Sequence, residues 1–357
     1  MSGTLRAVGF DAVQLSVVGN PIPVLDHVLM KPTGAADFSV ARDGSLAYIS
    51  GDSQGSGQSL AWVDRQGHEE PIAAPPRNYV FPRLSLDGQR VALDVRDQQN
   101  DIWIWDFARR VLTRLTTDPG ADQFPTWTPD GRRIAFGATR TEADFNLYWQ
   151  PADGTGVAER LTTSPHRQYP WAFTPDGKSL IMRDTDPKTG PDISVISMDG
   201  DHAPKPLIHS AFNEQNAELS PDGRWIAYQS NESGRDEIHV RPFPAVDGGH
   251  WQISTDGGAR PLWARSGREL FYVDVRQRIM VAPIQTSPSF AAGNPSVALD
   301  PSGGIFNTST GRNYDISPDG RRFLVIKSAP RDRSNPTQLN IVLNWGEELK
   351  RLVPVKK

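Results

Sequence analysis

The sequence contains no cysteine among its 357 residues. Disulfide bonds, a thiol nucleophile and thiolate metal ligands are therefore excluded. It also lacks any apolar run near the roughly 20 residues of a membrane-spanning helix, so we expect no membrane span. The first residues show neither the basic nor the apolar segment of a signal peptide. As written, the chain is expected in the cytoplasm, whereas a chain that is exported or part of a membrane kinase would act outside it.

The sequence also lacks a strong charge of one sign. Lys and Arg number 38 against 42 Asp and Glu, which gives a net charge of −4. This balance does not favour a nucleic acid partner, and we expect none. Basic pairs such as Arg109-Arg110 are interpreted as solvated charges in turns.

Helical patterns are nearly absent, with one short candidate at residues 347–352. A parallel α/β enzyme would need a crossover helix of roughly ten or more residues between its strands, and the sequence leaves no room for one. Hydrophobic residues make up 37% of the chain, which has 31 Gly and 30 Pro. This composition is typical of many short strands joined by polar turns, so the predicted fold class is all-β.

One phrase recurs along the chain, and its best copy is Leu219-Ser-Pro-Asp-Gly-Arg-Trp-Ile-Ala-Tyr228. Pro221 presets the first corner of a turn, Asp222 can bond back to the turn backbone, and Gly223 takes a left-handed conformation. Alternating apolar residues follow, as in a half-buried strand. Each copy is therefore predicted to form the tight turn of a β-hairpin. The copies lie at Asp43-Gly44, Asp87-Gly88, Asp130-Gly131, Asp176-Gly177, Asp222-Gly223, Ser266-Gly267 and Asp319-Gly320.

Successive copies are 43 to 53 residues apart. A period of about 40–45 residues with four strands per unit is typical of β-propeller blades. We predict one seven-bladed propeller over residues 1–357, with blades of four antiparallel strands. Six or eight blades remain open because the terminal units are irregular. Residues 37–345 would form the seven repeats, residues 1–36 would close the last blade beside residues 338–344, and residues 346–357 would form a tail.

The N-terminal segment resembles a segment near the other end of the chain. Gly19-Asn-Pro-Ile-Pro-Val-Leu-Asp26 is similar to Gly293-Asn-Pro-Ser-Val-Ala-Leu-Asp300, and each segment precedes a hairpin turn. The N-terminus is therefore interpreted as the outer part of a repeat whose inner part is missing.

The repeat resembles the TolB-like (WD40-like) propeller repeat, most clearly at Leu115-Thr116, Pro125-Thr-Trp127, Pro129-Asp-Gly131 and Ile134-Ala-Phe136. A second stretch is similar to the propellers of bacterial transmembrane serine/threonine kinases: Ser230-Asn-Glu-Ser-Gly-Arg235, Glu237-Ile-His-Val-Arg-Pro-Phe-Pro244 and Trp251-Gln-Ile-Ser254. The resemblance covers essentially the whole chain. The kinase motifs themselves are absent from the sequence, so kinase activity is not implied.

The resemblance implies a non-enzymatic binding or sensor scaffold that recognises a protein, a peptide or another ligand and needs no cofactor. It also implies a kinase or a transport protein, encoded nearby, as a partner, and we expect a monomer. The alternative is enzymatic: a propeller-type hydrolase or lyase with a metal ion in its channel, or the gating domain of a prolyl oligopeptidase-like peptidase. Glu218 and Asp315 are scattered candidates for such a channel metal.

Three patterns that suggest chemistry have simpler interpretations. Gly51-Asp-Ser53-Gln-Gly55 matches a nucleophile elbow, but no helix follows it, so it is interpreted as a loop. Asp184, Asp186 and Asp192 lack the spacing of a calcium-binding loop. The histidines form no close-spaced metal pair and are interpreted as solvated loop residues. We therefore predict no catalytic residue and no metal ligand. The histidines are His27, His68, His166, His202, His209, His239 and His250.

The loops that lead into the first strand of each unit are expected to surround one mouth of the central channel. Counting back six and seven residues from each turn gives amides, aromatic residues and two arginines, a mixture enriched at recognition surfaces. These positions are the predicted ligand-binding surface. The predicted binding residues are Phe81, Gln123, Phe124, Tyr169, Gln215, Asn216, Arg260, Arg312 and Asn313.

Overall fold

The computed structural model describes residues 3–26, 28, 36–50, 57–97, 99–140, 145–300, 311–327 and 338–352. The chain divides into two compact units. The central unit is Gln58–Ser328, and the terminal unit combines Met1–Gly57 with Ala329–Lys357. This division differs from the single domain expected from the sequence, and each unit is described separately.

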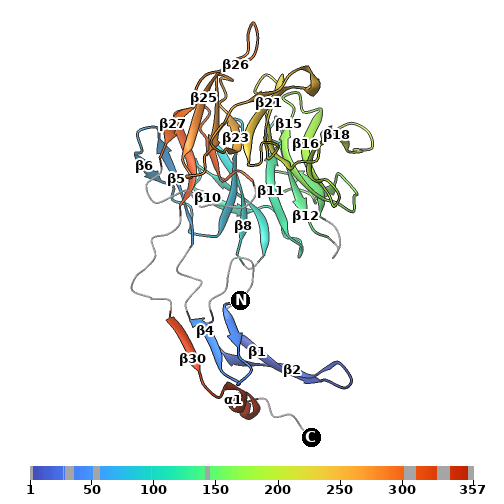
Figure 1. Cartoon of the computed structure of the whole chain (residues 1–357), viewed down its shortest axis with the longest axis vertical. Coiled ribbons are helices and arrows are strands. Elements are labelled where there is room, and N and C mark those ends of the chain that lie inside the picture. The colour runs from blue at the N-terminus through green and yellow to red at the C-terminus, as the bar shows by residue number, and fades with distance from the viewer. Residues whose placement is uncertain are drawn as a thin grey trace. The chain divides into compact units, whose positions relative to one another are not determined.

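The described residues of the central unit form six antiparallel sheets (Figure 1). The first sheet holds β7 (Tyr79–Leu84), β8 (Arg90–Arg96), β9 (Asn100–Asp106) and β10 (Val111–Arg114). The second holds β11 (Asp122–Trp127), β12 (Arg133–Ala138), β13 (Asn146–Pro151) and β14 (Glu159–Arg160). The third holds β15 (Arg167–Phe173), β16 (Ser179–Asp186), β17 (Gly190–Ser197) and β18 (Lys205–Ile208).

The fourth sheet holds β19 (Glu214–Leu219), β20 (Trp225–Ser230), β21 (Glu237–Pro242) and β22 (Trp251–Gln252), with the short 3-10 helix η2 (Val246–Gly248) before β22. The fifth holds β23 (Ala259–Trp263), β24 (Glu269–Val273) and β25 (Ile279–Gln285), and β25 also pairs with β26 (Ala291–Ala292) and β27 (Ser296–Leu299). The sixth joins β28 (Tyr314–Ile316) and β29 (Arg322–Lys327) to β5 (Ser59–Asp64) and β6 (Glu69–Pro71).

The first strands of successive sheets contact one another, which places them around a common axis. β11 contacts β7 and β15, β19 contacts β15 and β23, and β28 contacts β7. Tyr314 and Phe323 of the sixth sheet pack in one core cluster with Leu262 and Phe271 of the fifth. The sheets therefore form a closed ring, and the prediction of an all-β propeller is confirmed.

The strands that close the ring are not the strands that the sequence analysis predicted for this role. β29 pairs with β5, from Arg322 opposite Asp64 to Lys327 opposite Ser59. The described residues thus form six sheets in the ring rather than seven blades, a count that the irregular termini had left open. β30 (Gln338–Val342) pairs instead with β4 (Leu46–Ser50) in the terminal unit.

The burial of β5 gives the physical reason for this closure. Four successive residues, Leu60, Ala61, Trp62 and Val63, are buried, so β5 is apolar on both faces and fits between two sheets. In β2 (Ser16–Leu25), by contrast, the first eight residues are exposed. A strand that closes a propeller must bury both of its faces, and β5 meets this requirement while β2 does not.

The hairpin turns have the geometry predicted from the sequence. The glycine of all seven copies has a φ between +66° and +83°, the left-handed region that glycine adopts without strain. In the best copy, Ser220 Oγ donates to Asp222 Oδ1 at 2.6 Å and accepts from Trp225 N at 3.0 Å. The same serine or threonine bond to the turn aspartate recurs at Ser85, Thr128, Thr174 and Ser317.

Replacing Gly223 by valine is expected to lower the free energy of unfolding by about 2 kcal/mol. The φ of Gly223 is +68°, and a Cβ there would lie 3.0 Å from Pro175 Cδ of the neighbouring turn. Gly154→Val is the matched control, since Gly154 has a φ of +78° and a Cβ there would meet no neighbouring atom within 4 Å. Urea denaturation should show a loss for both variants and a larger loss for Gly223→Val. An unchanged midpoint for Gly223→Val would contradict the turn assignment.

Alternation along each strand divides its side chains between two neighbouring sheets. In β20, Ile226 and Tyr228 belong to a core cluster with Ile193 of the third sheet. Ala227 between them belongs to a cluster with Trp263 of the fifth sheet. Each sheet is therefore packed on both faces, and this packing fixes the first strands around the axis.

The described residues of the terminal unit form two small sheets. β1 (Leu5–Asp11) pairs with β2, and β3 (Phe38–Val40), β4 and β30 form the second sheet, which is followed by α1 (Trp345–Leu352). Leu5 lies opposite Leu25 and, after a one-residue shift, Arg6 lies opposite Pro23. β25 and β27 pair in the same register, with Ile279 opposite Leu299 and Met280 opposite Val297. The register of β1 and β2 therefore agrees with the predicted similarity of the N-terminus to the outer strands of a repeat.

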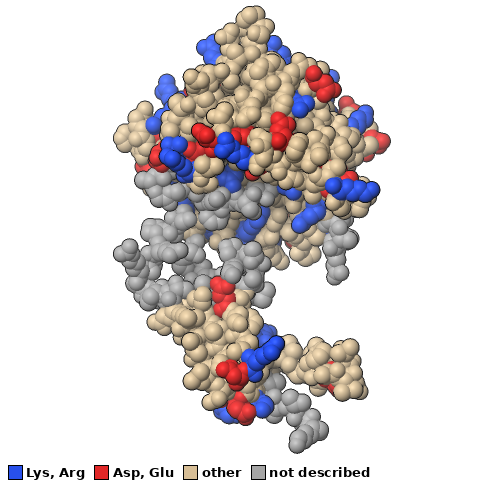
Figure 2. All heavy atoms as spheres, in the orientation of Figure 1, with Lys and Arg blue, Asp and Glu red and all other residues tan. Residues whose placement is uncertain are grey.

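Two surface properties bear on partners. In the part of the chain that the structure describes, no helix has the length and apolar character needed to cross a membrane. Figure 2 shows basic and acidic side chains interspersed on the visible face of the central unit. This mixture is consistent with the balanced composition of the sequence.

Candidate functional site

Each first strand of the propeller presents equivalent positions to the axis. Four residues six positions before the hairpin turn have a positive φ: Phe81 at 49°, Phe124 at 59°, Asn216 at 55° and Arg260 at 59°. Each lies within a register shift between the first and second strands of its sheet. Such bulges bend a strand and redirect its side chains. Because the conformation costs energy in a non-glycine residue, its recurrence marks a regular feature of the ring.

Aromatic rings fill the axis beside the first three sheets. Phe81, Phe124, Tyr169 and Trp171, the axial aromatic cluster, come from β7, β11 and β15 and are all buried. The Phe124 ring lies 4.3 Å from that of Phe81, 4.4 Å from that of Tyr169 and 6.0 Å from that of Trp171, measured between centroids. The contact with Phe81 is stacked and the other two are edge-on, both favourable geometries. This cluster joins three sheets at one point.

Polar side chains occupy the corresponding positions of the other sheets. Asn216 Nδ2 donates to Gln229 Oε1 at 2.8 Å, and the backbone N of Arg260 donates to the same oxygen at 3.3 Å. Arg260 Nη1 donates to Asn313 Oδ1 at 3.4 Å, and Tyr314 Oη donates to the Arg260 carbonyl at 3.0 Å. These bonds connect the fourth, fifth and sixth sheets.

Most of the predicted binding residues are therefore packed inside the ring. Only Gln123 and Gln215 of the nine are partly exposed, and Gln215 Oε1 accepts from Arg183 Nη1 at 3.4 Å. A role of these nine residues in binding stays a prediction. Arg312 is the one of the nine that also lines the cavity described next. The buried members are Phe81, Phe124, Tyr169, Asn216, Arg260, Arg312 and Asn313.

A cavity of about 500 Å³ lies on the axis, at the end of the ring where the hairpin turns meet. We call it the axial cavity. Each of the six sheets contributes two residues to the lining. One lies four positions before the turn aspartate, or before Ser266 in the fifth sheet, and the other lies directly before that aspartate or serine. The first set is Arg83, Thr126, Ala172, Glu218, Leu262 and Asp315. The second set, at the rim, is Leu86, Pro129, Pro175, Pro221, Arg265 and Pro318.

The axial cavity was not predicted from the sequence, because the predicted surface lies six and seven residues before each turn. Positions four residues and one residue before the turn form the two rings of the cavity instead. The regular spacing of the turns identifies equivalent positions on the first strands. Which of these positions enclose open space depends on the large aromatic rings at positions such as Phe124, and the spacing does not reveal this. These rings fill the axis further along the strands.

Charged side chains inside the axial cavity are paired with one another. Arg312 Nη1 lies 3.4 Å from Glu218 Oε1, and Arg312 Nη2 lies 3.8 Å from Asp315 Oδ2. Asp315 also accepts from the backbone N of Leu84 at 2.8 Å. Arg83 Nη1 donates to the Arg312 carbonyl at 2.9 Å. Both carboxylates are thus already engaged by a cation or a backbone amide.

Burial shifts the ionisation of these groups. It lowers the pKa of Arg83 to about 9, and the nearby positive charge of Arg312 adds to this effect. Burial raises the pKa of Glu218. For Arg312, burial alone would lower the pKa, but the attraction of Glu218 and Asp315 outweighs it and the pKa is raised. Both arginines therefore carry a charge at neutral pH, and with Arg265 the lining has three positive charges against two carboxylates.

Several buried donors on residues of the cavity wall lack a hydrogen-bond partner within the described chain. They are Arg83 Nε, Arg312 Nε, Trp171 Nε1 and Trp263 Nε1. A buried donor without a partner costs about 1–3 kcal/mol. These donors are sealed from solvent, so it is the charge balance of the lining, three guanidinium groups against two carboxylates, that suits a ligand with oxygen acceptors.

The other candidates from the sequence do not assemble into a site. Residues 51–56, which include the whole Gly51–Gly55 motif, lie outside the described residues. Asp184 pairs with His166 at 3.2 Å and Asp192 with His209 at 3.4 Å. Asp186 accepts from the backbone N of Lys188. These carboxylates have separate partners, and they lie in the paired strands β16 and β17 rather than in a long loop between strands.

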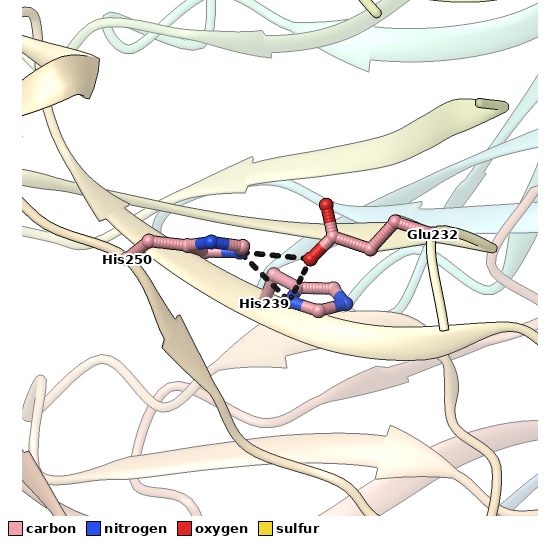
Figure 3. Close-up of side chains that lie close together, drawn as sticks. All are labelled: Glu232, His239 and His250. Carbon is pink, nitrogen blue, oxygen red and sulfur yellow. Dashed lines mark hydrogen bonds and ion pairs between the residues drawn. The ribbon is translucent and has the colours of Figure 1, made fainter. Parts of the chain in front are cut away.

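The interpretation of the histidines as solvated loop residues is wrong for His239. It lies in β21 and is 1% exposed. Its ring contacts His250 and Glu232 (Figure 3). No close spacing in the sequence reveals this group, because the three residues meet only when β21 pairs with β22.

Comparisons with known proteins agree with this architecture. The sequence of residues 26–240 matches the TolB beta propeller domain (PD40). The chain is 27% identical over 145 residues to an uncharacterized protein of Agrobacterium fabrum, covering 40% of this chain and 49% of that protein. The matched part thus spans about half the length of that relative.

Solved structures show the same fold. A protein assigned as TolB from Agrobacterium tumefaciens superposes with a TM-score of 0.64 at 20% identity, over 77% of this chain and 99% of that chain. TolB from Acinetobacter baumannii superposes with a TM-score of 0.53 at 17% identity, over 70% and 68%. A protein assigned as a 6-phosphogluconolactonase from Bacteroides uniformis reaches 0.50 at 16% identity, over 80% and 97%. These identities establish the fold alone. Because the family match covers more than half of the chain, this protein belongs to the TolB beta propeller domain family.

Proposed function

We propose that the central unit is a non-enzymatic binding module that takes an extended segment of a protein or peptide into the axial cavity. The observation that supports this function best is the cavity itself, to which all six sheets contribute both wall and rim. A recessed site with an apolar rim and a few convergent polar groups is the usual form of a binding pocket.

The chemistry of the lining favours a polypeptide with oxygen acceptors near its bound end. The rim has four prolines and Leu86, which offer apolar contact without losing much side-chain entropy on binding. Behind it, Arg83 and Arg312 are charged, and four buried donors of the wall have no partner within the described chain. Backbone carbonyls or a carboxylate of the ligand would pair with the charged arginines of the lining.

The same lining gives little support to catalysis. Glu218 and Asp315 are the cavity carboxylates, and the guanidinium of Arg312 lies at ion-pair distance from both. A metal ion between them would compete with this guanidinium. The proposal therefore favours binding over the hydrolase or lyase alternative. Enzymes occur among the solved neighbours, and the one assigned as a 6-phosphogluconolactonase shares only the fold with this chain.

Filling the axial cavity tests the proposal. Ala172→Trp places a large ring in the cavity wall, and Arg265→Glu reverses the charge at the rim. The probe is a phage-displayed library of random peptides selected on the wild-type protein. We expect either substitution to weaken binding of the selected peptides by about tenfold or more, which corresponds to about 1.4 kcal/mol.

Two substitutions outside the cavity serve as matched controls. Ala291→Trp and Arg276→Glu make the same chemical changes at exposed positions of the fifth sheet, and they should leave binding unchanged. Equal binding by Ala172→Trp and Ala291→Trp, with both variants folded by circular dichroism, would contradict the proposal. Failure to select any peptide would contradict it as well.

The surface predicted from the sequence is kept as a second contact surface under this proposal, restricted to its exposed members. Replacing Gln123 and Gln215 together perturbs no buried side chain. Replacing Tyr169 or Arg260 would also disturb the packing of the axis, because both are buried. Loss of binding in the double glutamine variant would extend the site to the opposite end of the first strands.

A further inference from the structure

Three side chains with metal-binding atoms converge in the fourth sheet, away from the axial cavity (Figure 3). Glu232 lies between β20 and β21, His239 lies within β21, and His250 directly precedes β22. β21 pairs with β22, with His239 opposite Gln252, which brings His250 beside His239. The three residues belong to one sheet of the propeller.

The three polar atoms form a nearly regular triangle. Glu232 Oε1 lies 3.4 Å from His239 Nδ1 and 3.3 Å from His250 Nε2, and the two nitrogens lie 2.9 Å apart. His239 is 1% exposed, while the side chains of Glu232 and His250 are 28% and 36% exposed. One corner of the triangle is thus held inside the protein and two corners reach the surface.

Hydrogen atoms cannot satisfy all three edges of this triangle at once. The carboxylate oxygen only accepts, and a neutral imidazole nitrogen either donates or accepts. If one nitrogen donates to the other, the accepting nitrogen directs its lone pair at the carboxylate. If both nitrogens carry protons, these protons face each other across the short edge. A positive ion that accepts all three lone pairs removes this conflict.

The dimensions of the triangle agree with such an ion. Zinc bonds of about 2.0–2.1 Å at tetrahedral angles place neighbouring ligand atoms about 3.3 Å apart, close to the observed edges. The three atoms are two imidazole nitrogens and one carboxylate oxygen. Neutral imidazole and carboxylate are the forms that bind metal.

We propose that Glu232, His239 and His250 bind one divalent transition-metal ion, with zinc the preferred ion. Two histidines and one carboxylate leave a fourth tetrahedral position open. Tyr228 Oη lies 3.4 Å from His250 Nε2 and accepts from Arg241 Nε at 2.8 Å.

A bound metal ion would hold together two of the segments that connect the strands of the fourth sheet. Glu232 belongs to the link between β20 and β21, and His250 to the link between β21 and β22 that contains η2. The ion would therefore stabilise the outer edge of this sheet. It needs no ligand in the axial cavity, so the two proposals can fail independently.

Zinc binding by the full-length protein, freed of any histidine tag and treated with chelator, tests the site. Isothermal titration with zinc chloride should show one saturable site per chain in the wild type. Cobalt chloride should give the intense visible absorption of a tetrahedral complex. His250→Ala and Glu232→Gln should each weaken zinc binding by tenfold or more, roughly the effect of losing one ligand. They should also abolish the rise in Tm that zinc causes in the wild type.

The matched control is His68→Ala, which removes a histidine whose side chain is 83% exposed and remote from this sheet in the sequence. This variant should bind zinc as the wild type does. His250 and Glu232 are used rather than His239 because their partial exposure makes folding of the variants robust, which circular dichroism would verify. No saturable zinc binding in the wild type would overturn the proposal. Equal binding by wild type and His250→Ala would overturn it too.

Discussion

Replacing Phe124 by alanine is expected to lower the free energy of unfolding by about 4 kcal/mol. Phe124 is 5% exposed and its ring contacts the rings of Phe81, Tyr169 and Trp171. Its removal therefore creates a cavity where the first three sheets meet. The neighbouring strands are held on their other faces by the next sheets, so they cannot close in to fill the space.

Urea denaturation followed by tryptophan fluorescence measures this effect, because Trp171 lies beside the deleted ring. Phe212→Ala is the matched control, since Phe212 is 42% exposed and the same atoms are removed without a comparable cavity. We expect the control to lose less than about 1 kcal/mol. Similar losses for the two variants would show that the axial aromatic cluster does not hold the sheets together.

The turns could be predicted from the sequence because their structure is local. Pro221, Asp222 and Gly223 each contribute a conformational preference that acts within four residues, so the same phrase gives the same hairpin at every copy. The regular spacing then predicted the four-stranded sheets. These parts of the fold follow from short-range physics and repetition, and they are confirmed.

The number of sheets in the ring is a long-range property and could not be predicted in the same way. The Asp43-Gly44 turn has the same Asp-Gly pair as most other copies, yet its hairpin pairs with β30 in the terminal unit. What decides the closure is that β5 pairs with β29 across more than 250 residues. The one local sign was the unbroken apolar run from Leu60 to Val63, which requires burial on both faces.

The residues of the candidate site were also difficult to predict, because their arrangement depends on contacts between distant parts of the sequence. Arg312, Glu218 and Asp315 were named from the sequence as residues near the channel and line the axial cavity, whereas Arg83 was missed as a wall residue. A bulge shifts the side-chain alternation by one position, and no local signal marks the bulge at residues such as Asn216, which are not glycine. His239 and His250 were missed for a related reason, because only strand pairing brings them together.

Replacing Arg312 by methionine is expected to destabilise the propeller by about 3–5 kcal/mol at neutral pH. The side chain is 7% exposed and lies at ion-pair distance from Glu218 and Asp315. Methionine keeps much of the volume but removes the charge, so two carboxylates lose a buried cation. Arg83 remains nearby and offsets part of the loss, because its pKa rises when the positive charge of Arg312 is absent.

The pH dependence of this loss identifies its electrostatic origin. Burial already raises the pKa of Glu218, and removing Arg312 raises it further. A carboxyl whose pKa is higher in the folded state favours folding at low pH, and this contribution is lost as the pH rises through the folded-state pKa. The deficit of Arg312→Met relative to wild type should therefore be largest at neutral pH and shrink towards about pH 4, near the ordinary pKa of glutamate. Urea denaturation at several pH values measures it.

Two further variants separate charge from packing at Arg312. Adding Glu218→Gln to Arg312→Met removes one of the two carboxylates that have lost their cation. The double variant should therefore recover part of the lost stability at neutral pH. Arg322→Met removes an arginine from an exposed ion pair with Glu70, and we expect it to cost less than about 1 kcal/mol. If the deficit of Arg312→Met is the same at every pH and is not relieved by Glu218→Gln, then Arg312 stabilises the ring through packing alone. In that case the charge balance assigned to the axial cavity is wrong.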